Sequence, residues 1–592
     1  MAQSLLSRFE ERASMSSSPE YNRFVSTLPS MDRLSDRMQA MTNDDPAFEV
    51  RREVVGQQGE MSVFARAPQT LPEWFARADA FPSRSFLVLG NRVHTYAEAR
   101  AEANWLARAL QTEFNVKPGD KVGLCARNSP EWVISFMAVQ LCGGVAVLLN
   151  SWWTADELAY GLKDSGAKLL LCDSEREAQA ADYCAANGIQ RLCIRHRFDP
   201  SEAYQTLINT YRGQPALPSH RVADDPATIL YTSGSTGYPK GVLSSHRGVI
   251  SALYSWALMA RAIGGLMTAL PDLKDGQEVI LLPVPLFHVT GCHASMLGCF
   301  GTGRKLVMMD KWDAEQSLQL IEEHSVSHFL GVPTQSFEIL RHPKRESYNL
   351  TSLIELAGGG SARPAEHVGA IQSAFDHATP RIGYGLTETN ALGAINGGPS
   401  YVVKPGSTGP VTGPVMELEV HAEDSDTPLA TGEVGRVCFR GPSIMIGYFN
   451  REDDTAKAIS PGGWFDSGDL GYLDEDGFLF LVDRAKDIIV RGGENISCLE
   501  VEACIHAHPQ VRDVTVFGLP DERLGEVVTA MVYLRPDGQG ASAEDIQAYA
   551  GQTLARYKVP AEILFADAPL PRGATEKIDK KTVRAAILAE RS

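Results

Sequence analysis

Short apolar runs alternate with amphipathic segments through the first two-thirds of the chain. Segments such as TADELAYGLKDSG have the spacing of amphipathic helices. The apolar runs are typical of buried strands, and they are KVGLC, GVAVLLN, AKLLLC, RLCI, ATILYT, VILLPVPLF, GRKLVMM and VSHFLGVP. This alternation predicts an α/β fold with a large N-terminal domain of parallel α/β layers.

After about residue 404 the pattern changes to short alternating strands with Gly or Asp turns, as in ELEVHAED, GEVGRVCFRG and GFLFLVDRAKD. This texture predicts an antiparallel or distorted β-barrel segment. A final unit begins near Asp483, with the helical patterns CLEVEACIHAHP and AEDIQAYAGQTLA and the strand patterns DVTVFGLP and VVTAMVYLRP. These patterns predict a small α+β C-terminal domain.

Two stretches bear on membranes and targeting. The apolar stretch 132–149 is long enough to span a bilayer marginally, but Gln140 and the Gly143-Gly144 pair indicate a buried helix, a turn and a buried strand instead. The N-terminus lacks the sustained apolar core of a signal peptide. We interpret it as a polar extension, partly helical or without fixed structure, with a targeting or docking segment as the alternative.

The chain length limits the number of domains, and the net charge limits the classes of function. With 592 residues, the chain is too long for one core and predicts about three or four domain-sized units. Its formal net charge of -18 argues against nucleic-acid binding. The 10 cysteines are scattered without zinc-type spacing, so we expect buried thiols and a cytoplasmic location. A homodimer and peripheral membrane contact stay open.

The segment YTSGSTGYPKG, residues 231–241, has the parts of a phosphate-binding loop. Gly234 and Gly237 let backbone N–H groups approach an anion, and Lys240 supplies a positive charge. Hydroxyl donors come from Thr232, Ser233, Ser235 and Thr236. The segment is not the P-loop of nucleotide triphosphatases, because a glycine follows Lys240. Taken alone, it is also compatible with a Ser/Gly surface turn.

Two further motifs could contact a nucleotide. GYGLTETN places Tyr384, Thr387 and Glu388 after a short strand, where the ring could stack on a base, the hydroxyl could bind a phosphate and the carboxylate could bind Mg²⁺. GGWFDSGDLGYL is interpreted as a turn that presents Asp469 to the hydroxyls of a ribose. Each motif alone has a simpler explanation, a capped helix start or an acidic turn.

The order of the motifs is more specific than any one of them. Next come DRAKDIIVRGGENI, ARYKVP and, near the end of the chain, Lys577. From about Leu71 to Arg584 the sequence resembles the adenylate-forming superfamily, which includes acyl-CoA synthetases, firefly luciferase and nonribosomal-peptide adenylation domains. The resemblance implies an N-terminal extension (1–50), an adenylation domain (51–485) and a mobile C-terminal lid domain (486–592).

The resemblance implies that the chain adenylates a small carboxylic acid with ATP and then transfers the acyl group to coenzyme A. It implies ATP, Mg²⁺ and coenzyme A as bound partners, with no nucleic acid and no integral membrane span. The loop from Thr232 to Lys240 is expected to close on the β- and γ-phosphates, Thr387 to contact the α-phosphate and Glu388 to bind Mg²⁺. The remaining nucleotide contacts are expected to be Gly359, Gly360, Tyr384, Asp469 and Arg484.

The C-terminal motifs imply two arrangements of the lid domain. Lys577 matches the catalytic lysine, whose charge lowers the repulsion between carboxylate and α-phosphate. Lys486 matches the hinge about which the lid domain rotates. After that rotation Arg491, Gly492 and Gly493 are expected to line the tunnel for the pantetheine chain of coenzyme A.

Two positions depart from the family pattern. Glu576 precedes Lys577 where the family usually has glycine. It is explained by a side chain that points to solvent, by an introduced substitution that impairs adenylation, or by a natural non-catalytic homologue. Ser361-Ala362-Arg363 replaces the common Ala-Pro-Leu, and only local effects are expected there.

The acyl pocket is assigned to Phe287, His288, Gly331, Gly358 and Gly385. With no carboxylate in PVPLFHVTG to pair an α-ammonium, we expect an acid without an α-amine. We interpret His288 as an aromatic gate rather than a base, because carboxylic acids are already ionised at neutral pH. The glycines predict room for a long or bulky acyl group, although backbone strain explains them equally. A medium- or long-chain fatty acid is favoured, with aryl and polycyclic acids as alternatives.

Other reactions share these motifs. A luciferase-type oxygenase would carry all of them. An acyl-AMP ligase that loads a carrier protein would lack productive binding of coenzyme A, and the intact RGGEN stretch disfavours it. The alternative of a homologue that only binds nucleotide is supported by Glu576 alone.

We expect Glu576→Gly to change the rate of CoA-dependent AMP formation by less than about fivefold, because a solvated surface charge contributes roughly 1 kcal/mol or less. Parallel assays of both chains on fatty and aryl acids measure the change. Turnover by the glycine variant alone would identify Glu576 as the residue that prevents adenylation.

Overall fold

Local signals define several helices in the first part of the chain. Thr95 and Glu98 form a capping box at the start of α5 (Tyr96–Glu113), and Thr154 begins α7 (Ala155–Ser165) in the same way. α7 ends at Gly166, whose φ of 63° closes the last turn. The helix predicted from TADELAYGLKDSG is therefore confirmed.

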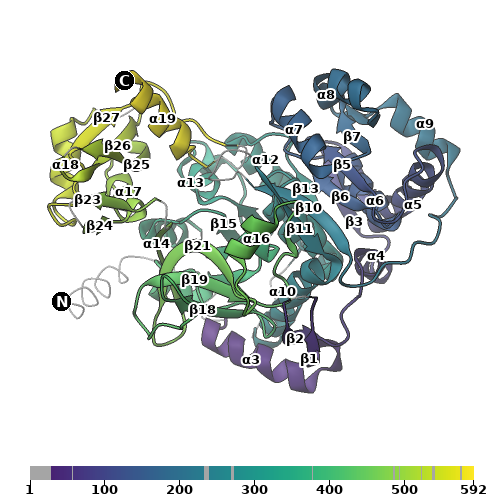
Figure 1. Ribbon diagram of the computed structural model, residues 1–592, viewed down its shortest axis with the longest axis horizontal. Coiled ribbons are helices and arrows are strands. Elements are labelled where there is room, and N and C mark those ends of the chain that lie inside the picture. The colour runs from purple at the N-terminus through teal and green to yellow at the C-terminus, as the bar shows by residue number, and fades with distance from the viewer. Residues whose placement is uncertain are drawn as a thin grey trace.

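The computed structural model has a large body with the C-terminal unit beside it, drawn in yellow and yellow-green in Figure 1. It describes residues 28–56, 58–232, 239–267, 273–375, 378–484, 487–491, 494–521, 523–536, 540–573 and 577–591.

The large body contains two eight-stranded sheets whose central strands are parallel. The first has the order β20 (Gly447–Tyr448), β11 (Lys240–Ser245), β10 (Pro226–Thr232), β6 (Val145–Leu148), β5 (Lys121–Cys125), β7 (Leu169–Asp173), β8 (Gln190–His196), β9 (Asp199–Pro200). The second has the order β17 (Gly393–Gly397), β16 (Thr379–Gly385), β15 (Glu355–Gly359), β14 (His328–Gly331), β12 (Val279–Leu282), β13 (Lys305–Met308), β3 (Ser85–Leu89), β4 (Arg92–Thr95).

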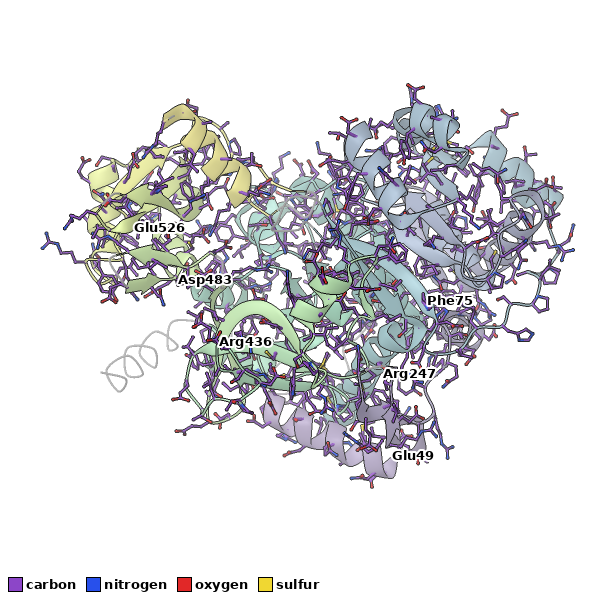
Figure 2. The ribbon with its side chains drawn as sticks, viewed as in Figure 1. Glu49, Phe75, Arg247, Arg436, Asp483 and Glu526 are labelled. Carbon is purple, nitrogen blue, oxygen red and sulfur yellow. The ribbon has the colours of Figure 1, made fainter. Side chains whose placement is uncertain are left out.

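The core joins the two sheets through a central helical layer. α5, α6 (Pro130–Leu141) and α10 (His246–Leu266) share one apolar cluster with strands of both sheets. Phe75, at the end of α4 (Leu71–Phe75), is 2% exposed and its ring contacts Phe136 and Phe300 (Figure 2). The predicted α/β fold with parallel layers is confirmed.

Further helices cover the outer faces or connect the strands. α7 and α8 (Ser174–Asn187) pack on the first sheet, whereas α12, α13 and α14 pack on the second. Their bounds and those of the connecting helices are α12 (Ala314–His324), α13 (Pro333–Arg341), α14 (Ala365–Ala374), α9 (Glu202–Thr210), α11 (Gly298–Thr302), α15 (Gly398–Val403) and α16 (Glu452–Ala458).

Residues 132–149 form most of α6 and then β6, so the buried helix, turn and strand predicted there are confirmed. Among the described residues one helix, α10, is long and apolar enough to cross a membrane. In the structure, 56% of the most apolar stretch of this helix is buried. Because core helices often reach this length and hydropathy, α10 is weak support for a membrane span.

An antiparallel sheet follows residue 404, as the change of pattern predicted. Its order is β18 (Glu417–His421), β19 (Gly435–Arg440), β21 (Phe465–Leu473) and β22 (Leu479–Arg484). Arg436 of β19 pairs with Asp466 of β21, with Nη1 and Oδ2 2.7 Å apart (Figure 2).

The C-terminal unit has its own sheet and core. Its elements are β23 (Ile489–Arg491), β24 (Glu494–Ile496), α17 (Cys498–His506), β25 (Val511–Asp521), β26 (Gly525–Leu534), α18 (Ala543–Ala550), β27 (Glu562–Phe565) and α19 (Lys580–Arg591). The two helices and two strands predicted there are confirmed. Asp483 of β22 links this unit to the large body, since its Oδ2 accepts a hydrogen bond from the Leu499 N–H at 3.2 Å (Figure 2).

The described part of the N-terminal extension packs on α10. α3 (Met31–Asp44) buries an apolar face that includes Leu34 and Met38. The hairpin of β1 (Val50–Val54) and β2 (Glu60–Phe64) follows. Arg247 at the start of α10 ties this hairpin to the body through Glu53, at 3.0 Å (Figure 2).

Candidate active site

Asp469 lies inside β21, directly opposite Arg484 of β22. The interpretation of GGWFDSGDLGYL as a turn is therefore wrong. Gly468 has φ of 72°, and the pairing register with β19 shifts beside it, which defines a bulge within the strand rather than its end. The bulge explains why a glycine-flanked aspartate in a strand has the sequence pattern of a turn.

The Asp469 carboxylate is 6% exposed and is held by two neighbours. The Tyr384 hydroxyl donates to Oδ2 at 2.6 Å, and Arg484 Nε lies 3.0 Å from Oδ1. Burial raises the pKa of Asp469, while the charge of Arg484 and the Tyr384 hydrogen bond oppose the shift. Tyr384 belongs to β16, so this cluster joins the second large sheet to the antiparallel sheet.

Glu388 forms a second polar centre nearby in the chain. It lies in a 3₁₀ turn (Thr387–Thr389) and is 9% exposed. The Tyr448 hydroxyl donates to its Oε1 at 2.9 Å, and burial raises the pKa of the Glu388 carboxyl. Lys240 Nζ lies 4.8 Å from the centre of the Tyr448 ring and 3.1 Å from Asp454 Oδ2. Tyr448 therefore connects the end of the loop segment to Glu388.

Lys577 reaches the large body at Gly360. A Cβ atom added to Gly360, which has φ of 76°, would lie 3.2 Å from Lys577 Nζ. The residue is solvent-exposed as a whole, but protein atoms crowd its ammonium. This burial and the charge of Arg484 lower the pKa of Lys577 to about 8, against the opposing effect of Asp469. The C-terminal lysine and the Asp469 cluster thus meet in one place.

Phe287 and His288 lie beside this cluster. Phe287 is 3% exposed, and the two ring centres are 4.5 Å apart. Burial, with a smaller effect of Lys577, lowers the pKa of His288 to about 3. Its Nε2 is buried without a hydrogen-bond partner among the described residues. His288 is therefore a neutral imidazole at neutral pH.

The space beside the pocket glycines is filled by the chain itself. A Cβ at Gly331 would lie 2.4 Å from Gln335 Oε1, and one at Gly358 would lie 2.6 Å from Arg363 Nη2. A Cβ at Gly385 would lie 2.4 Å from the Ala391 carbonyl oxygen. Neighbouring side chains therefore occupy the positions that a side chain at Gly331 or Gly358 would take. The expectation that these glycines leave room for a long acyl group stays a prediction. Gly359 is less confined, with the Gly383 oxygen 3.3 Å from an added Cβ.

The structure describes only some of the other predicted site residues. Thr232 ends β10 and lies opposite Lys240 of the antiparallel strand β11. Arg491 lies in β23 opposite Glu494, within the C-terminal sheet. The remaining predicted positions lie outside the described residues: Ser233, Gly234, Ser235, Thr236, Gly237, Lys486, Gly492, Gly493 and Glu576.

Two residues of this region had no role assigned from the sequence. Tyr448 lies in IGYFN, which matches none of the motifs used, and its contact with Glu388 depends on tertiary structure. Arg363 was noted only as a departure from a common pattern, yet it is 6% exposed and beside Gly358. Its burial depends on tertiary packing, so the sequence carries no signal that identifies it.

Comparisons with known proteins show the family of the chain. The family model of the AMP-binding enzyme matches residues 74–449, and that of the AMP-binding enzyme C-terminal domain matches residues 500–577. The chain therefore belongs to the AMP-binding enzyme family. Within it, the chain falls in the acyl- and aryl-CoA synthetase branch and is an acid–thiol ligase.

The relatives are named for different acid substrates. The chain is 30% identical to the long-chain-fatty-acid–CoA ligase of Bacillus subtilis, over 85% of this chain and 91% of the relative. It is 32% identical to the 3-[(3aS,4S,7aS)-7a-methyl-1,5-dioxo-octahydro-1H-inden-4-yl]propanoyl:CoA ligase of Mycobacterium tuberculosis, over 85% and 96%. The o-succinylbenzoate coenzyme A synthetase of Bacillus subtilis, solved with ATP and magnesium ion, superposes with a TM-score of 0.71 at 28% identity, over 86% and 99%.

We expect adenylation to weaken above pH 8, because Lys577 acts as a cation and its pKa is lowered to about 8. One unit above this pKa, kcat/KM for ATP–pyrophosphate exchange falls roughly tenfold, since this parameter reports the free enzyme. A profile from pH 6.5 to 10 measures it, with Lys577→Ala as the control that lacks the titrating group. A wild-type rate unchanged up to pH 10 contradicts the assignment.

Proposed function

We propose that this chain activates a carboxylic acid without an α-amine as its acyl-adenylate, with Mg²⁺-ATP as co-substrate, and passes the acyl group to coenzyme A. The observation that carries the proposal is the position of Lys577 at Gly360, beside Asp469 and Arg484. A cation from a separate unit stands where two anions, a carboxylate and a phosphate, must meet.

The two steps follow from the chemistry of a carboxylate, whose own leaving group would be oxide. In the first, a carboxylate oxygen attacks the α-phosphorus of ATP, and the bond to pyrophosphate breaks. In the second, the sulfur of coenzyme A attacks the acyl carbon, and AMP leaves with the bonding electrons. Lys577 stabilises the negative charge of the first step. Thr387 and the loop from Thr232 to Lys240 hold the phosphates.

The cluster around Asp469 is suited to the nucleoside of ATP. Its two carboxylate oxygens can accept hydrogen bonds from the ribose hydroxyls, and Arg484 and Tyr384 fix their direction. Gly359 and Gly360 would frame the adenine ring, since neither carries a side chain. The bulge at Gly468 sets the position of the carboxylate, so the ribose site depends on one left-handed residue.

Glu388 fits the Mg²⁺ that accompanies ATP. Its carboxylate is buried, and Tyr448 uses only one of about four acceptor positions. The o-succinylbenzoate coenzyme A synthetase solved with ATP and magnesium supports this assignment. When bound, the ion would offset the charge of the phosphates.

A medium- or long-chain fatty acid is the acid we propose. Phe287 and the neutral His288 give an uncharged wall, and the long-chain-fatty-acid–CoA ligase relative supports it. Acids with carbonyl-bearing rings are the second candidate, because Arg363 is buried beside Gly358 with its Nε unpaired among the described residues. A guanidinium in that position could donate to a carbonyl or carboxylate of the acid.

All 10 cysteines are free, and eight of them are buried. This supports the proposal of a reducing, cytoplasmic location.

CoA-dependent AMP formation on straight-chain fatty acids, coumarate and a keto-substituted ring acid tests the proposal. We expect kcat/KM to rise roughly fourfold with each CH₂ added to the fatty acid until the pocket is filled, because each buried CH₂ contributes about 0.8 kcal/mol. Without coenzyme A, ATP–pyrophosphate exchange should persist. A preference for a ring acid supports the second candidate, and absence of exchange with every acid contradicts the function.

The substitution Arg363→Leu distinguishes between the two proposed classes of acid substrate. We expect fatty-acid turnover to stay within about threefold, since an alkyl tail offers no acceptor to a guanidinium. Kinetics on both acid classes measure it, with the exposed Arg212→Leu as the matched control. A selective loss of tenfold or more on the keto acid would instead assign Arg363 to substrate recognition.

A further inference from the structure

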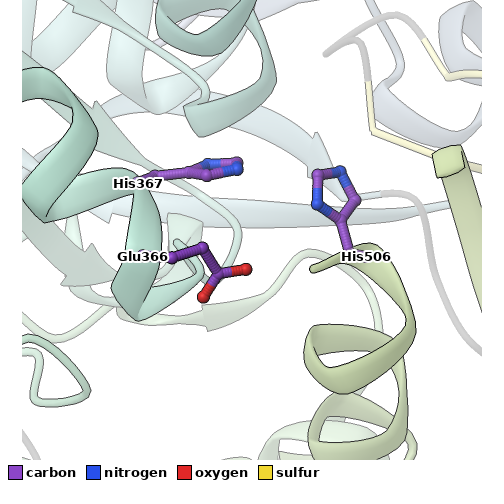
Figure 3. Close-up of side chains that lie close together, drawn as sticks. All are labelled: Glu366, His367 and His506. Carbon is purple, nitrogen blue, oxygen red and sulfur yellow. The ribbon is translucent and has the colours of Figure 1, made fainter. Parts of the chain in front are cut away.

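Two histidines and a glutamate meet where the large body and the C-terminal unit face each other. Glu366 and His367 lie in the first turn of α14, and His506 is the last residue of α17. Figure 3 shows the three side chains directed toward one another. One ligand atom from each lies within 4.8 Å of the others. These side chains are outside the site described above.

Ring packing fixes the histidines. His367 stacks on Phe337 of α13, with ring centres 4.0 Å apart and planes at 11°. The His506 ring meets His367 edge-on, with centres 5.3 Å apart and planes at 71°. His367 is 6% exposed, and its Nδ1 is buried without a hydrogen-bond partner among the described residues. A buried lone pair of this kind costs free energy that a ligand could recover.

The histidines carry the protonation state that metal binding requires. Burial, then the neighbouring His506 and arginines, lowers the pKa of His367 to about 3, and burial also lowers the pKa of His506. Both imidazoles are therefore neutral at neutral pH and offer lone pairs. Glu366 is exposed, and its pKa is raised by desolvation. The charged groups that face the histidines are Arg341, Arg363, Arg535, Arg572 and Asp513.

These surroundings favour some ions over others. The arginines repel any cation, so an ion held mainly by charge, such as Ca²⁺ or Mg²⁺, is disfavoured. Asp513 offsets part of the repulsion, although Arg572 Nη2 lies 2.7 Å from it. Zn²⁺ and similar ions form strong bonds to neutral imidazole, with tetrahedral N and O ligands roughly 3.3 Å apart. The ligand atoms of Glu366, His367 and His506 lie within 4.8 Å of one another, so they reach that separation by side-chain shifts of the order of 1 Å.

We propose that Glu366, His367 and His506 form a site for a divalent transition metal of the zinc class, which bridges α14 and α17. A bound ion would stabilise the arrangement in which Lys577 lies at Gly360. This consequence rests on the proposed function and on the rotation of the lid domain that the family resemblance implies, by which the C-terminal unit turns away before coenzyme A reacts. The ion would therefore leave adenylation intact and slow thioester formation.

Direct binding tests the site without any activity. Zn²⁺ is titrated against a chromophoric chelator with the full chain, and we expect one ion per chain. His506→Ala and the exposed Glu366→Gln should each weaken binding at least about tenfold. His220→Ala, an exposed histidine elsewhere, is the matched control and should not change it. Absence of binding, or equal affinity in all four chains, overturns the site.

The bridging effect is tested on the two half-reactions. With saturating Zn²⁺ and Mg²⁺-ATP, we expect acyl-CoA formation to fall several-fold while ATP–pyrophosphate exchange stays constant, and His506→Ala to abolish the effect. Equal inhibition of wild type and His506→Ala overturns the bridge. If no acid supports exchange, the proposed function fails while the binding titration still decides the metal site.

Discussion

The contact between the Lys577 ammonium and Gly360 is the interaction on which the site depends. It joins two units with separate cores, and it exists because Gly360 has no side chain and a backbone conformation that favours glycine. Burial and the charge of Arg484 lower the pKa of Lys577, so this position disfavours the charged amine although Asp469 opposes the shift. On the proposed function, the phosphates of ATP would reverse that balance and favour the arrangement in which Lys577 lies at Gly360.

The receiving surface is assembled from distant parts of the large body. Tyr384 comes from the second large sheet, whereas Asp469 and Arg484 face each other across the antiparallel sheet. Tyr448 comes from the edge of the first large sheet and reaches Glu388. The polar groups therefore come from three sheets, and a small movement between sheets would separate Tyr384 from Asp469 and Tyr448 from Glu388. The apolar layer between the two large sheets limits such movement.

The sequence predicted elements well where their signals are local. KVGLC coincides with β5, and residues 132–149 with most of α6 and with β6, because uninterrupted apolar residues leave few alternatives. It failed where one residue has an unusual backbone, since Gly468 in a strand has the pattern of a turn. The prediction from sequence also failed where the position of a residue depends on tertiary contacts. Arg363 follows Gly358 closely in the sequence, but its burial against that glycine depends on packing. The histidine pair on Phe337 joins α14 to α17, whose proximity no spacing indicates.

Two of the contacts between the C-terminal unit and the body, that of Lys577 and that of His506, differ in chemistry. The Lys577 contact is electrostatic, so its strength depends on which anions fill the cleft. The packing of His506 against His367 and Phe337 involves neutral rings, so nucleotide changes it little. The ring contact therefore gives the closed arrangement a basal stability, and the lysine contact makes that stability respond to substrate. On the proposed function, the negative charge beside Lys577 falls once pyrophosphate leaves, so the lysine contact would weaken before the ring contact. The ring contact would then limit how readily the unit turns toward coenzyme A.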